Sequence, residues 1–442
     1  MKSLRELFRI GKGPSSSHTM GPDNAARIYA KRHPEAKGFE VTLYGSLAAT
    51  GKGHMTDVAI IDVLSKIAPV NIVWKPKEFL PFHPNGMKFT ADRGDDWTVY
   101  SVGGGALSEG KAEGDMFASG VDVYEMNKMK DIMVWCKKTG HGYWEYVEQC
   151  EGPEIWDFLK EVFHTMQEAV KRGLDAEGAL PGPLGLSRKA VSYYVKAQGY
   201  NEAARYSAML YSYALAVIEE NACGGTIVTA PTCGSCGILP AILYEHYHDL
   251  KFSEQRILRA LATAGLFGNV VKHNASISGA EVGCQGEIGV ACAMAAAAGC
   301  QLWGGSPNQI EYAAEMGLEH HLGMTCDPIC GLVQIPCIER NAFAAARAAD
   351  ATFYAISSDG NHRISFDHVV EVMKRTGHDL PSLYKETSEG GLALDYKEQH
   401  GHQILYSGFY AHKGATSGYE EEWNQNRCDE LHFCSTDHER HE

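Results

Sequence analysis

Four cysteines lie in two glycine- and proline-rich stretches of the chain, GAEVGCQGE at residues 279–287 and TCDPICGLVQIPC at residues 325–337. Glycine and proline let the backbone turn, so the thiols can face one point instead of packing along a helix. A single cysteine is most often a small buried hydrophobic residue. Four of them in two such stretches favour a metal site.

Thiolate is the soft ligand that iron–sulfur clusters and zinc prefer. The candidate ligands are Cys284, Cys326 and Cys337. A cluster held by only three protein thiolates keeps one iron open for a substrate oxygen. Zinc is the alternative, although structural zinc sites usually show a tight C-x-x-C pair and these four cysteines form none.

The composition is that of an ordinary enzyme. The 442 residues are 44% hydrophobic and 21% charged, which suffices for a large core and suggests two or three domains. The net charge of −15 disfavours nonspecific binding to nucleic acid or to a membrane. The longest apolar runs are too short for a bilayer span, so we expect no transmembrane helix.

The N-terminus and the cysteines indicate the compartment. Residues 1–8, MKSLRELF, mix acid with base and lack the apolar core and cleavage site of a signal peptide. Thirteen cysteines in a chain without an export signal favour reduced thiols or metal ligands over disulfides. We therefore expect a cytoplasmic protein.

Hydrophobic periodicity predicts an α+β N-terminal domain followed by a large all-α domain. In residues 1–107, β-rich runs at 39–44, 70–74 and 97–102 alternate with helical patterns at 21–31 and 56–66. Residues 108–152 are polar and irregular and are predicted to form a connector. The all-helical domain, residues 153–396, has predicted helices at 156–172, 201–221, 253–268, 288–302, 307–320, 338–357 and 366–377. Residues 397–442 form a polar tail.

Residues 11–22, GKGPSSSHTMGP, place hydroxyl groups and a histidine before a predicted helix. Backbone N–H groups at a helix N-terminus attract anions, so this stretch is suited to a carboxylate. An ordinary helix cap accounts for one hydroxyl but not for four beside a histidine. The candidate anion-binding residues are Ser15, Ser16, Ser17, His18 and Thr19.

Two further loops present polar side chains. Residues 44–57, YGSLAATGKGHMTD, fail as a phosphate-binding P-loop because Lys52 is followed by glycine and histidine rather than by Ser or Thr. The loop still presents Lys52 and His54, and an imidazole can move a proton near neutral pH. The turn PFHPNGM, residues 81–87, presents His83 and Asn85. A satisfied loop histidine is the alternative for either imidazole.

The stretch TAPTCGSCG, residues 229–237, holds a C-x-x-C pair, Cys233 and Cys236, without the βαβ pattern of a thioredoxin-like redox site. Lys272 opens a further polar run, KHNASISG at residues 272–279, which leads to Cys284. So many polar loop residues beside thiols exceed what a packed core needs.

Nine segments carry a resemblance to one family: GPSSSHTMGP (13–22), YGSLAATGKGH (44–54), HPNGM (83–87), SVGGG (101–105), EGALPGPL (177–184), TAPTCGSCG (229–237), NASISGAEVGCQGEIGVAC (274–292), EHHLGMTCDPICGLVQIPCIERNA (319–342) and ETSEGGLA (386–393). Together they resemble the iron–sulfur-dependent L-serine dehydratases, also called L-serine ammonia-lyases. The resemblance covers nearly the whole chain to about residue 393.

The resemblance implies a β domain joined to an all-helical α domain that holds a [4Fe-4S] cluster on Cys284, Cys326 and Cys337. Cys330 stands where the family commonly has glycine or alanine. The implied reaction removes water and then ammonia from L-serine, giving pyruvate for amino-acid catabolism and gluconeogenesis. The family tends to form dimers, so a homodimer is expected.

Within that reaction the open iron acts as a Lewis acid on the β-hydroxyl. His54 is the candidate base for the Cα proton, with His83 as its partner in proton transfer or substrate orientation. The residues of the Ser-rich stretch are expected to hold the substrate carboxylate, and Lys52 and Asn85 are weaker candidates.

Two departures from the family pattern affect the site. Cys233 stands where the family usually has asparagine, which bears on substrate choice. Some members end with a cysteine shortly after the GGLA segment that folds back to the open iron; here the chain continues into a tail that contains Cys428 and Cys434.

Three alternatives stay open. The same chemistry can act on threonine, cysteine or another β-substituted amino acid. A pyridoxal-phosphate enzyme would need a Schiff-base lysine, for which Lys272 is the one candidate, and a phosphate-binding loop that its context lacks. A non-catalytic amino-acid or redox sensor would use the N-terminal domain only to bind its ligand.

Overall fold

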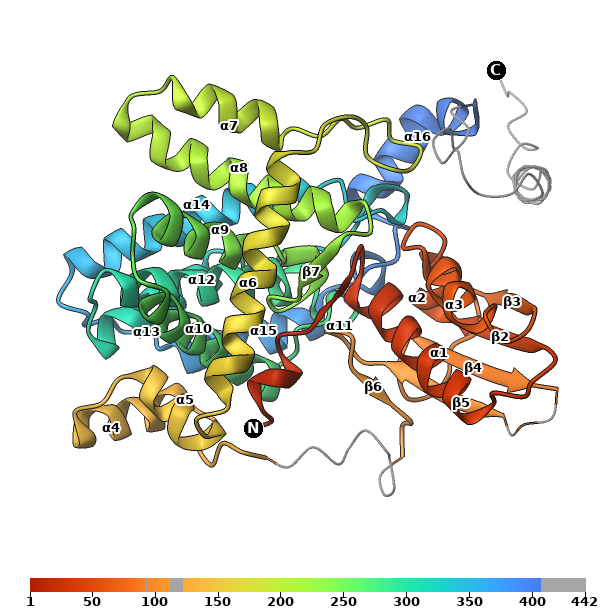
Figure 1. The fold of residues 1–442 in the computed structure, drawn as a ribbon, viewed down its shortest axis with the longest axis horizontal. Coiled ribbons are helices and arrows are strands. Elements are labelled where there is room, and N and C mark those ends of the chain that lie inside the picture. Colours follow the sequence, from red (N-terminus) through yellow and green to blue (C-terminus); the bar gives the residue numbers. More distant parts are fainter. Residues whose placement is uncertain (93, 95, 112–121, 407–442) are drawn as a thin grey trace, which may run out of the picture.

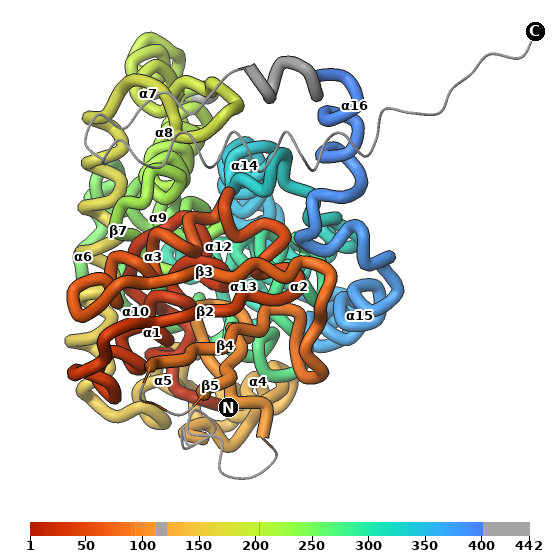
Figure 2. The backbone as a smooth tube through the Cα atoms, turned by 90° about the vertical axis from the view of Figure 1, so that its right-hand side faces the viewer, coloured from red at the N-terminus to blue at the C-terminus, as the bar shows by residue number. Residues whose placement is uncertain are grey.

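A computed structural model describes residues 1–92, 94, 96–111 and 122–406. A small α/β region lies beside a larger helical region (Figure 1). Seen from the side of the α/β region, its sheet lies in front of the helices that surround α12 (Ile288–Leu302) (Figure 2). This arrangement confirms the predicted order of an α/β part followed by a helical part. Among the described helices, none is both long and apolar enough to span a membrane.

The α/β region is built on a five-stranded sheet of order β3-β2-β4-β5-β6. The strands are β2 (Phe39–Tyr44), β3 (Val70–Lys75), β4 (Gly86–Ala91), β5 (Trp97–Ser101) and β6 (Leu107–Ser108), and only β3 runs parallel to its neighbour β2. Alternation in β2 buries Val41 and Leu43 and leaves Glu40 exposed. The buried face packs on α1 (Gly21–Arg32) and α3 (Thr56–Leu64).

Three strands and two helices were predicted here at nearly these bounds. Strand β4 was not, because residues 81–87 read as a turn and hid the start of the strand at Gly86. Its alternation of Met87 and Phe89 with Lys88 and Thr90 is the period of a half-buried strand.

Helix α12 is the centre of the helical region. Its residues from Ile288 to Cys300 are all buried, and it packs against α9, α10, α13 and α14. Six of the fifteen residues of α12 are alanine, which lets its neighbours approach closely. The other long helices are α6 (Ile155–Leu174), α7 (Ala190–Gln198), α8 (Glu202–Ala222), α9 (Ile238–Tyr244), α10 (Glu254–Asn274), α13 (Pro307–Glu319), α14 (Cys337–Ser357), α15 (Phe366–Asp379) and α16 (Gly391–Tyr406).

The expectation of an irregular connector at 108–152 is wrong for its second half. Helices α4 (Met129–Thr139) and α5 (Tyr143–Glu151) lie there, and Met129, Ile132 and Tyr143 join the core of the helical region. Each helix has a narrow apolar stripe on a polar surface, and the glycines between them end α4 and cap α5. Short length and polar composition concealed the helical period.

Residues 1–12, predicted as part of the α+β domain, pack on the helical region instead. Leu4, Leu7 and Phe8 are buried in its core, and strand β1 (Ile10–Lys12) pairs antiparallel with β7 (Thr226–Val228). Leu4, Leu7 and Phe8 have the three- and four-residue spacing of an apolar helical face, and helix α10 packs against this segment. The Ser-rich stretch that follows therefore begins at the junction of the two regions.

The predicted polar tail, residues 397–442, begins inside α16. Cys428 and Cys434 lie outside the described residues.

Candidate active site

The Ser-rich stretch forms one wide helical turn, η2 (Ser16–Met20), directly before α1. Its five residues and Ser15 are buried. The Ser15 hydroxyl accepts a hydrogen bond from the His18 N–H at 3.0 Å, and the Ser17 hydroxyl lies 2.8 Å from His18 Nδ1. The turn therefore presents hydroxyl groups and one imidazole inside the protein.

His54 lies beside His18. The ring centroids are 4.6 Å apart, and the Thr19 hydroxyl donates to the His54 carbonyl at 2.7 Å. His54 is 0% exposed, and within the described residues neither of its ring nitrogens has a hydrogen-bond partner. Burial, and next the neighbouring His18, lower the pKa of His54 well below its ordinary value. His54 is therefore a neutral imidazole with free lone-pair capacity.

His18 is neutral for a related reason, because burial lowers its pKa to about 4. Its Nε2 lies 3.2 Å from the carbonyl of Ser46 in α2 (Gly45–Ala49). His18 and His54 are therefore two uncharged imidazoles in contact.

The loop that carries His54 packs on the second cysteine stretch. A Cβ at Gly53 would lie 2.9 Å from the carbonyl oxygens of Cys330 and Gly331, so only glycine fits this approach. The contact brings the imidazoles of the α/β region to the thiols of the helical region.

His83 and Asn85 lie on the same side of the junction. His83 Nδ1 accepts a hydrogen bond from the Asn85 N–H at 3.1 Å, and its Nε2 lies 3.5 Å from Glu281 Oε1 of the helical region. The Asn85 amide donates to the Ser101 carbonyl at 3.3 Å, and its Oδ1 is buried without a partner among the described residues. An unpaired buried oxygen of this kind is suited to a ligand donor.

The structure does not bring Lys52 to this group. Its side chain is exposed, and its Nζ lies 5.6 Å from the centroid of the Trp74 ring. Lys272 is likewise elsewhere: its Nζ donates to the carbonyl of Glu6 at 2.7 Å, where residues 1–12 pack on α10.

The thiols meet around Glu287. Its Oε2 lies 3.8 Å from Cys284 Sγ and 3.7 Å from Cys326 Sγ, while its Oε1 accepts from the Thr232 hydroxyl at 2.8 Å. Burial raises the pKa of Glu287, and contact with Cys284 together with burial raises that of Cys326. The cluster of Cys284, Cys326 and Glu287 therefore consists of acidic side chains with little positive charge near them.

Cys337 begins α14 and completes the group. It is buried, and burial followed by the nearby Cys284 raises its pKa. Arg340, one turn further along α14, contacts the Cys284 thiol and donates to the Thr325 carbonyl at 2.8 Å. Cys330 differs from these thiols, because it is only half-buried and has a positive φ of 56°.

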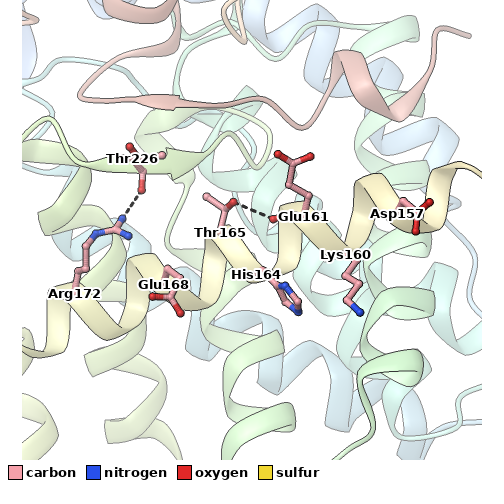
Figure 3. A pocket seen from close by; sticks show the side chains of 8 residues that line it. All are labelled: Asp157, Lys160, Glu161, His164, Thr165, Glu168, Arg172 and Thr226. Atoms are coloured by element: carbon pink, nitrogen blue, oxygen red, sulfur yellow. Dashed lines mark hydrogen bonds between the residues drawn. The ribbon is translucent and has the colours of Figure 1, made fainter.

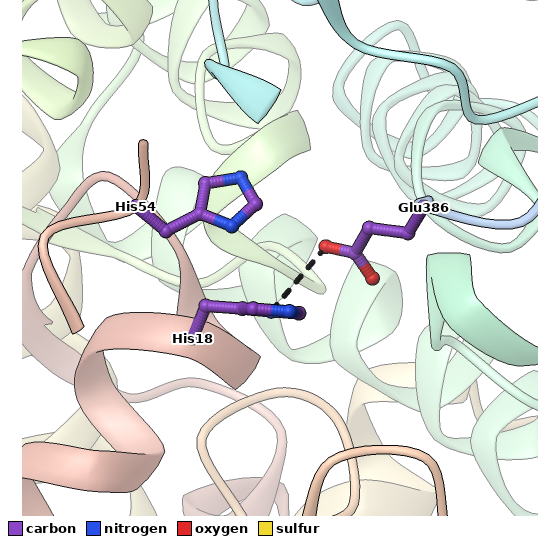
Figure 4. A group of neighbouring side chains, drawn as sticks. All are labelled: His18, His54 and Glu386. Carbon is purple, nitrogen blue, oxygen red and sulfur yellow. Dashed lines mark ion pairs between the residues drawn. The ribbon is translucent and has the colours of Figure 1, made fainter. Parts of the chain in front are cut away.

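Glu386 connects the two sides and was not among the predicted site residues. Its Oε1 lies 3.6 Å from His18 Nδ1, and its N–H donates to the Cys326 carbonyl at 2.7 Å (Figure 4). Glu281 and Glu287 were missed as well. All three lie within the quoted motifs, but no local pattern distinguishes them from surface carboxylates.

A surface groove lies away from this site. It follows the exposed face of α6, has a volume of about 550 Å³, and is lined by Lys160, His164 and Glu168 among others (Figure 3). His164 lies 3.0 Å from Glu254 Oε2, and Lys171 lies 2.9 Å from Glu168. These charges are satisfied by one another, and no thiol or buried imidazole lines the groove.

Comparison with known proteins gives the family. The sequence model of the serine dehydratase beta chain matches residues 3–75, and that of the serine dehydratase alpha chain matches residues 109–393. L-serine dehydratase 1 of Escherichia coli K12 and the L-serine dehydratase of Haemophilus influenzae are each 40% identical to this chain, over 89% of it and 99% of the relative. The L-serine dehydratase of Streptomyces coelicolor is 39% identical, over 90% of this chain and 99% of the relative. The chain therefore belongs to the serine dehydratase family, with the beta and alpha parts joined in one polypeptide.

Proposed function

We propose that this protein is an L-serine dehydratase: it removes water from L-serine to give aminoacrylate, which tautomerises to an imine that water hydrolyses to pyruvate and ammonia. The observation that carries the proposal is that the loop of the buried, neutral His54 packs on the cysteine stretch at residues 325–337, and that Glu386 contacts both His18 and Cys326. Loss of hydroxide and removal of the weakly acidic Cα proton both need catalysis. The thiol side suits a metal group that assists the leaving hydroxide, and the imidazole side suits acceptance of the proton.

The donor set fits a [4Fe-4S] cluster on Cys284, Cys326 and Cys337. The Cys284 and Cys326 thiols both face Glu287, and Cys337 is near enough to Cys284 to feel its charge. A Cβ at Gly279 would lie 3.2 Å from Cys326 Sγ and 2.7 Å from Glu287 Oε2, so glycine keeps this space open. The buried Ser278 hydroxyl has no partner among the described residues. When bound, a cluster with three protein thiolates supplies a Lewis acid for the leaving β-hydroxyl.

The protein's own groups handle the proton and the carboxylate. His54 takes the Cα proton on a ring nitrogen, because it is neutral and unpaired at neutral pH. His83, held by Asn85, assists proton transfer or orients the substrate. The hydroxyl groups of Ser15, Ser16, Ser17 and Thr19, with His18, hold the substrate carboxylate at the start of α1.

We further propose that the enzyme acts in the cytoplasm as a homodimer and supplies pyruvate to gluconeogenesis. Threonine and cysteine carry the same leaving-group pattern and are the substrates to compare with serine.

The test is anaerobic purification followed by iron and acid-labile sulfide analysis and a pyruvate assay on L-serine, L-threonine and L-cysteine. We expect iron and sulfide in equal amounts and the highest kcat/KM on L-serine, with activity lost in air. Full activity after prolonged aeration and chelation contradicts the cluster, and absence of pyruvate under iron-replete anaerobic conditions contradicts the dehydratase.

A further inference from the structure

We infer that the Glu386 carboxylate binds the α-ammonium group of the amino-acid substrate. The inference rests on the proposed function and adds a recognition group to the same site. It begins from how firmly this side chain is held between the two regions.

The backbone of Glu386 is fixed from both sides. Its N–H donates to the Cys326 carbonyl at 2.7 Å, and its carbonyl accepts from the Ser46 hydroxyl of α2 at 3.2 Å. Its φ of +58° lies in the left-handed region, which a residue with a long side chain adopts only when its surroundings demand it. Placing the Glu386 carboxylate in this position therefore costs conformational free energy.

The carboxylate points into the imidazole pair. Its oxygen and ring nitrogens of His18 and His54 all lie within 4.8 Å of one another (Figure 4), and Glu386 is only 8% exposed. Its neighbours there are His18, at 3.6 Å, and the backbone N–H of Ala280. Within the described part of the chain, no lysine or arginine pairs with it.

A buried carboxylate without a cation is costly unless a ligand supplies the charge. Two other carboxylates lie at the junction. Glu287 faces the thiols and has Arg340 nearby, whereas Glu281 faces His83, is also bonded to the Ser276 hydroxyl, and has a side chain that is 44% exposed. Among the described residues, Glu386 is thus the junction carboxylate that is shielded from water and has no positively charged side chain beside it. An α-ammonium group brings one positive charge and three donors, which matches this deficit.

The placement also orients the substrate. With the carboxylate of serine on the Ser-rich turn and its ammonium on Glu386, the Cα lies between the two anchors and beside His54. An α-ammonium anchor also explains selection for amino acids over hydroxy acids, because a buried polar group left unpaired rejects an analogue that lacks its partner.

The test compares L-serine with 3-hydroxypropionate, which lacks only the amino group, in the cluster-loaded enzyme. For Glu386→Gln we expect the KM of L-serine to rise about ten- to hundredfold, the usual cost of losing a hydrogen bond between charged groups. The dissociation constant of 3-hydroxypropionate, measured by anaerobic calorimetry, should stay within about threefold or become tighter, since this ligand gains nothing from the charge. Iron and sulfide content should match the wild type.

Glu386→Asp keeps the charge and tolerates a positive φ, so it should bind L-serine more tightly than Glu386→Gln, and it serves as the second test if Glu386→Gln loses iron. The matched control is Glu389→Gln, an exposed glutamate of the same segment, which should change neither ligand. An unchanged KM in Glu386→Gln, or equal weakening of both ligands, overturns the inference. A wild-type enzyme that forms no pyruvate would instead overturn the proposed function.

Discussion

The two sides of the junction between the helical and α/β regions differ in their charge and in their unpaired polar groups. The thiol side, from the helical region, gathers Cys284, Cys326 and Cys337 around Glu287 and has Arg340 as its cation. The imidazole side, from the α/β region, gathers His18 and His54, whose lowered pKa values keep them uncharged. The thiol side is short of positive charge. The imidazole side has, on His54, two ring nitrogens without a hydrogen-bond partner among the described residues.

The difference indicates how the two regions divide the chemical roles of the proposed reaction between them. Soft acidic ligands need a cation and suit a metal group, whereas a desolvated imidazole suits a proton acceptor. At the junction the described residues divide these groups between the two regions, and Glu386 and Glu281 each extend from the helical region to a histidine of the other. Substitutions on the two sides should therefore fail in different ways.

The largest effect is expected on the thiol side. Cys284→Ser, Cys326→Ser or Cys337→Ser should each abolish iron binding and activity, because a hydroxyl is a poorer and harder ligand. Iron and sulfide analysis of the anaerobically purified variants measures this. Cys330→Ser is the matched control and should keep its iron. Iron lost from Cys330→Ser but retained in Cys337→Ser would reverse the ligand assignment.

On the imidazole side, His54→Ala should keep the cluster and lower kcat by about 10²- to 10⁴-fold, the usual cost of removing a general base. Steady-state kinetics with α-deuterated serine, at matched iron content, measures the loss. The control is His141→Ala, an exposed histidine of the helical region, which should leave kcat unchanged. If His54→Ala shows normal kcat and a raised KM, then His54 positions the substrate and the base is His83 or His18.

The imidazole side should also weaken the fold in acid. The pKa of His18 falls from 6.5 to about 4 on folding, so below pH 6.5 the unfolded chain takes up a proton that the native state refuses. Stability therefore falls as the pH drops from 6.5 towards 4, by about 3 kcal/mol for this residue. Denaturant unfolding of the wild type and of His18→Gln across this range tests it. An equally steep loss in both proteins would assign the effect to other groups.

The smallest effect is expected at Lys52, which sequence analysis placed in substrate binding. Its exposed ammonium over Trp74 is worth about 0.5–1 kcal/mol at most, so Lys52→Ala should change the KM of L-serine by less than about threefold. Steady-state kinetics decides this. A rise of tenfold or more would show that the loop moves and brings Lys52 to the substrate.

Much of this molecule could be read from local signals. The unbroken apolar run of α12 and the alternation of β2 gave these elements nearly correct bounds. Glycine and proline around Cys284 and Cys337 marked turns that could gather thiols, and the hydroxyl-rich run before α1 marked a candidate anion site. Family motifs then supplied the reaction, which periodicity and spacing alone do not contain.

The sequence by itself determined most of the elements, the family and the cysteine, histidine and serine residues of the site, because each follows from neighbours along the chain. Only the tertiary structure decided that residues 1–12 belong to the helical core, that Lys52 faces Trp74, and that Glu386 faces His18. Those contacts join residues far apart in the chain, and they form only when the two regions pack together. A carboxylate such as Glu386 looks like any surface glutamate until that packing buries it beside two neutral imidazoles.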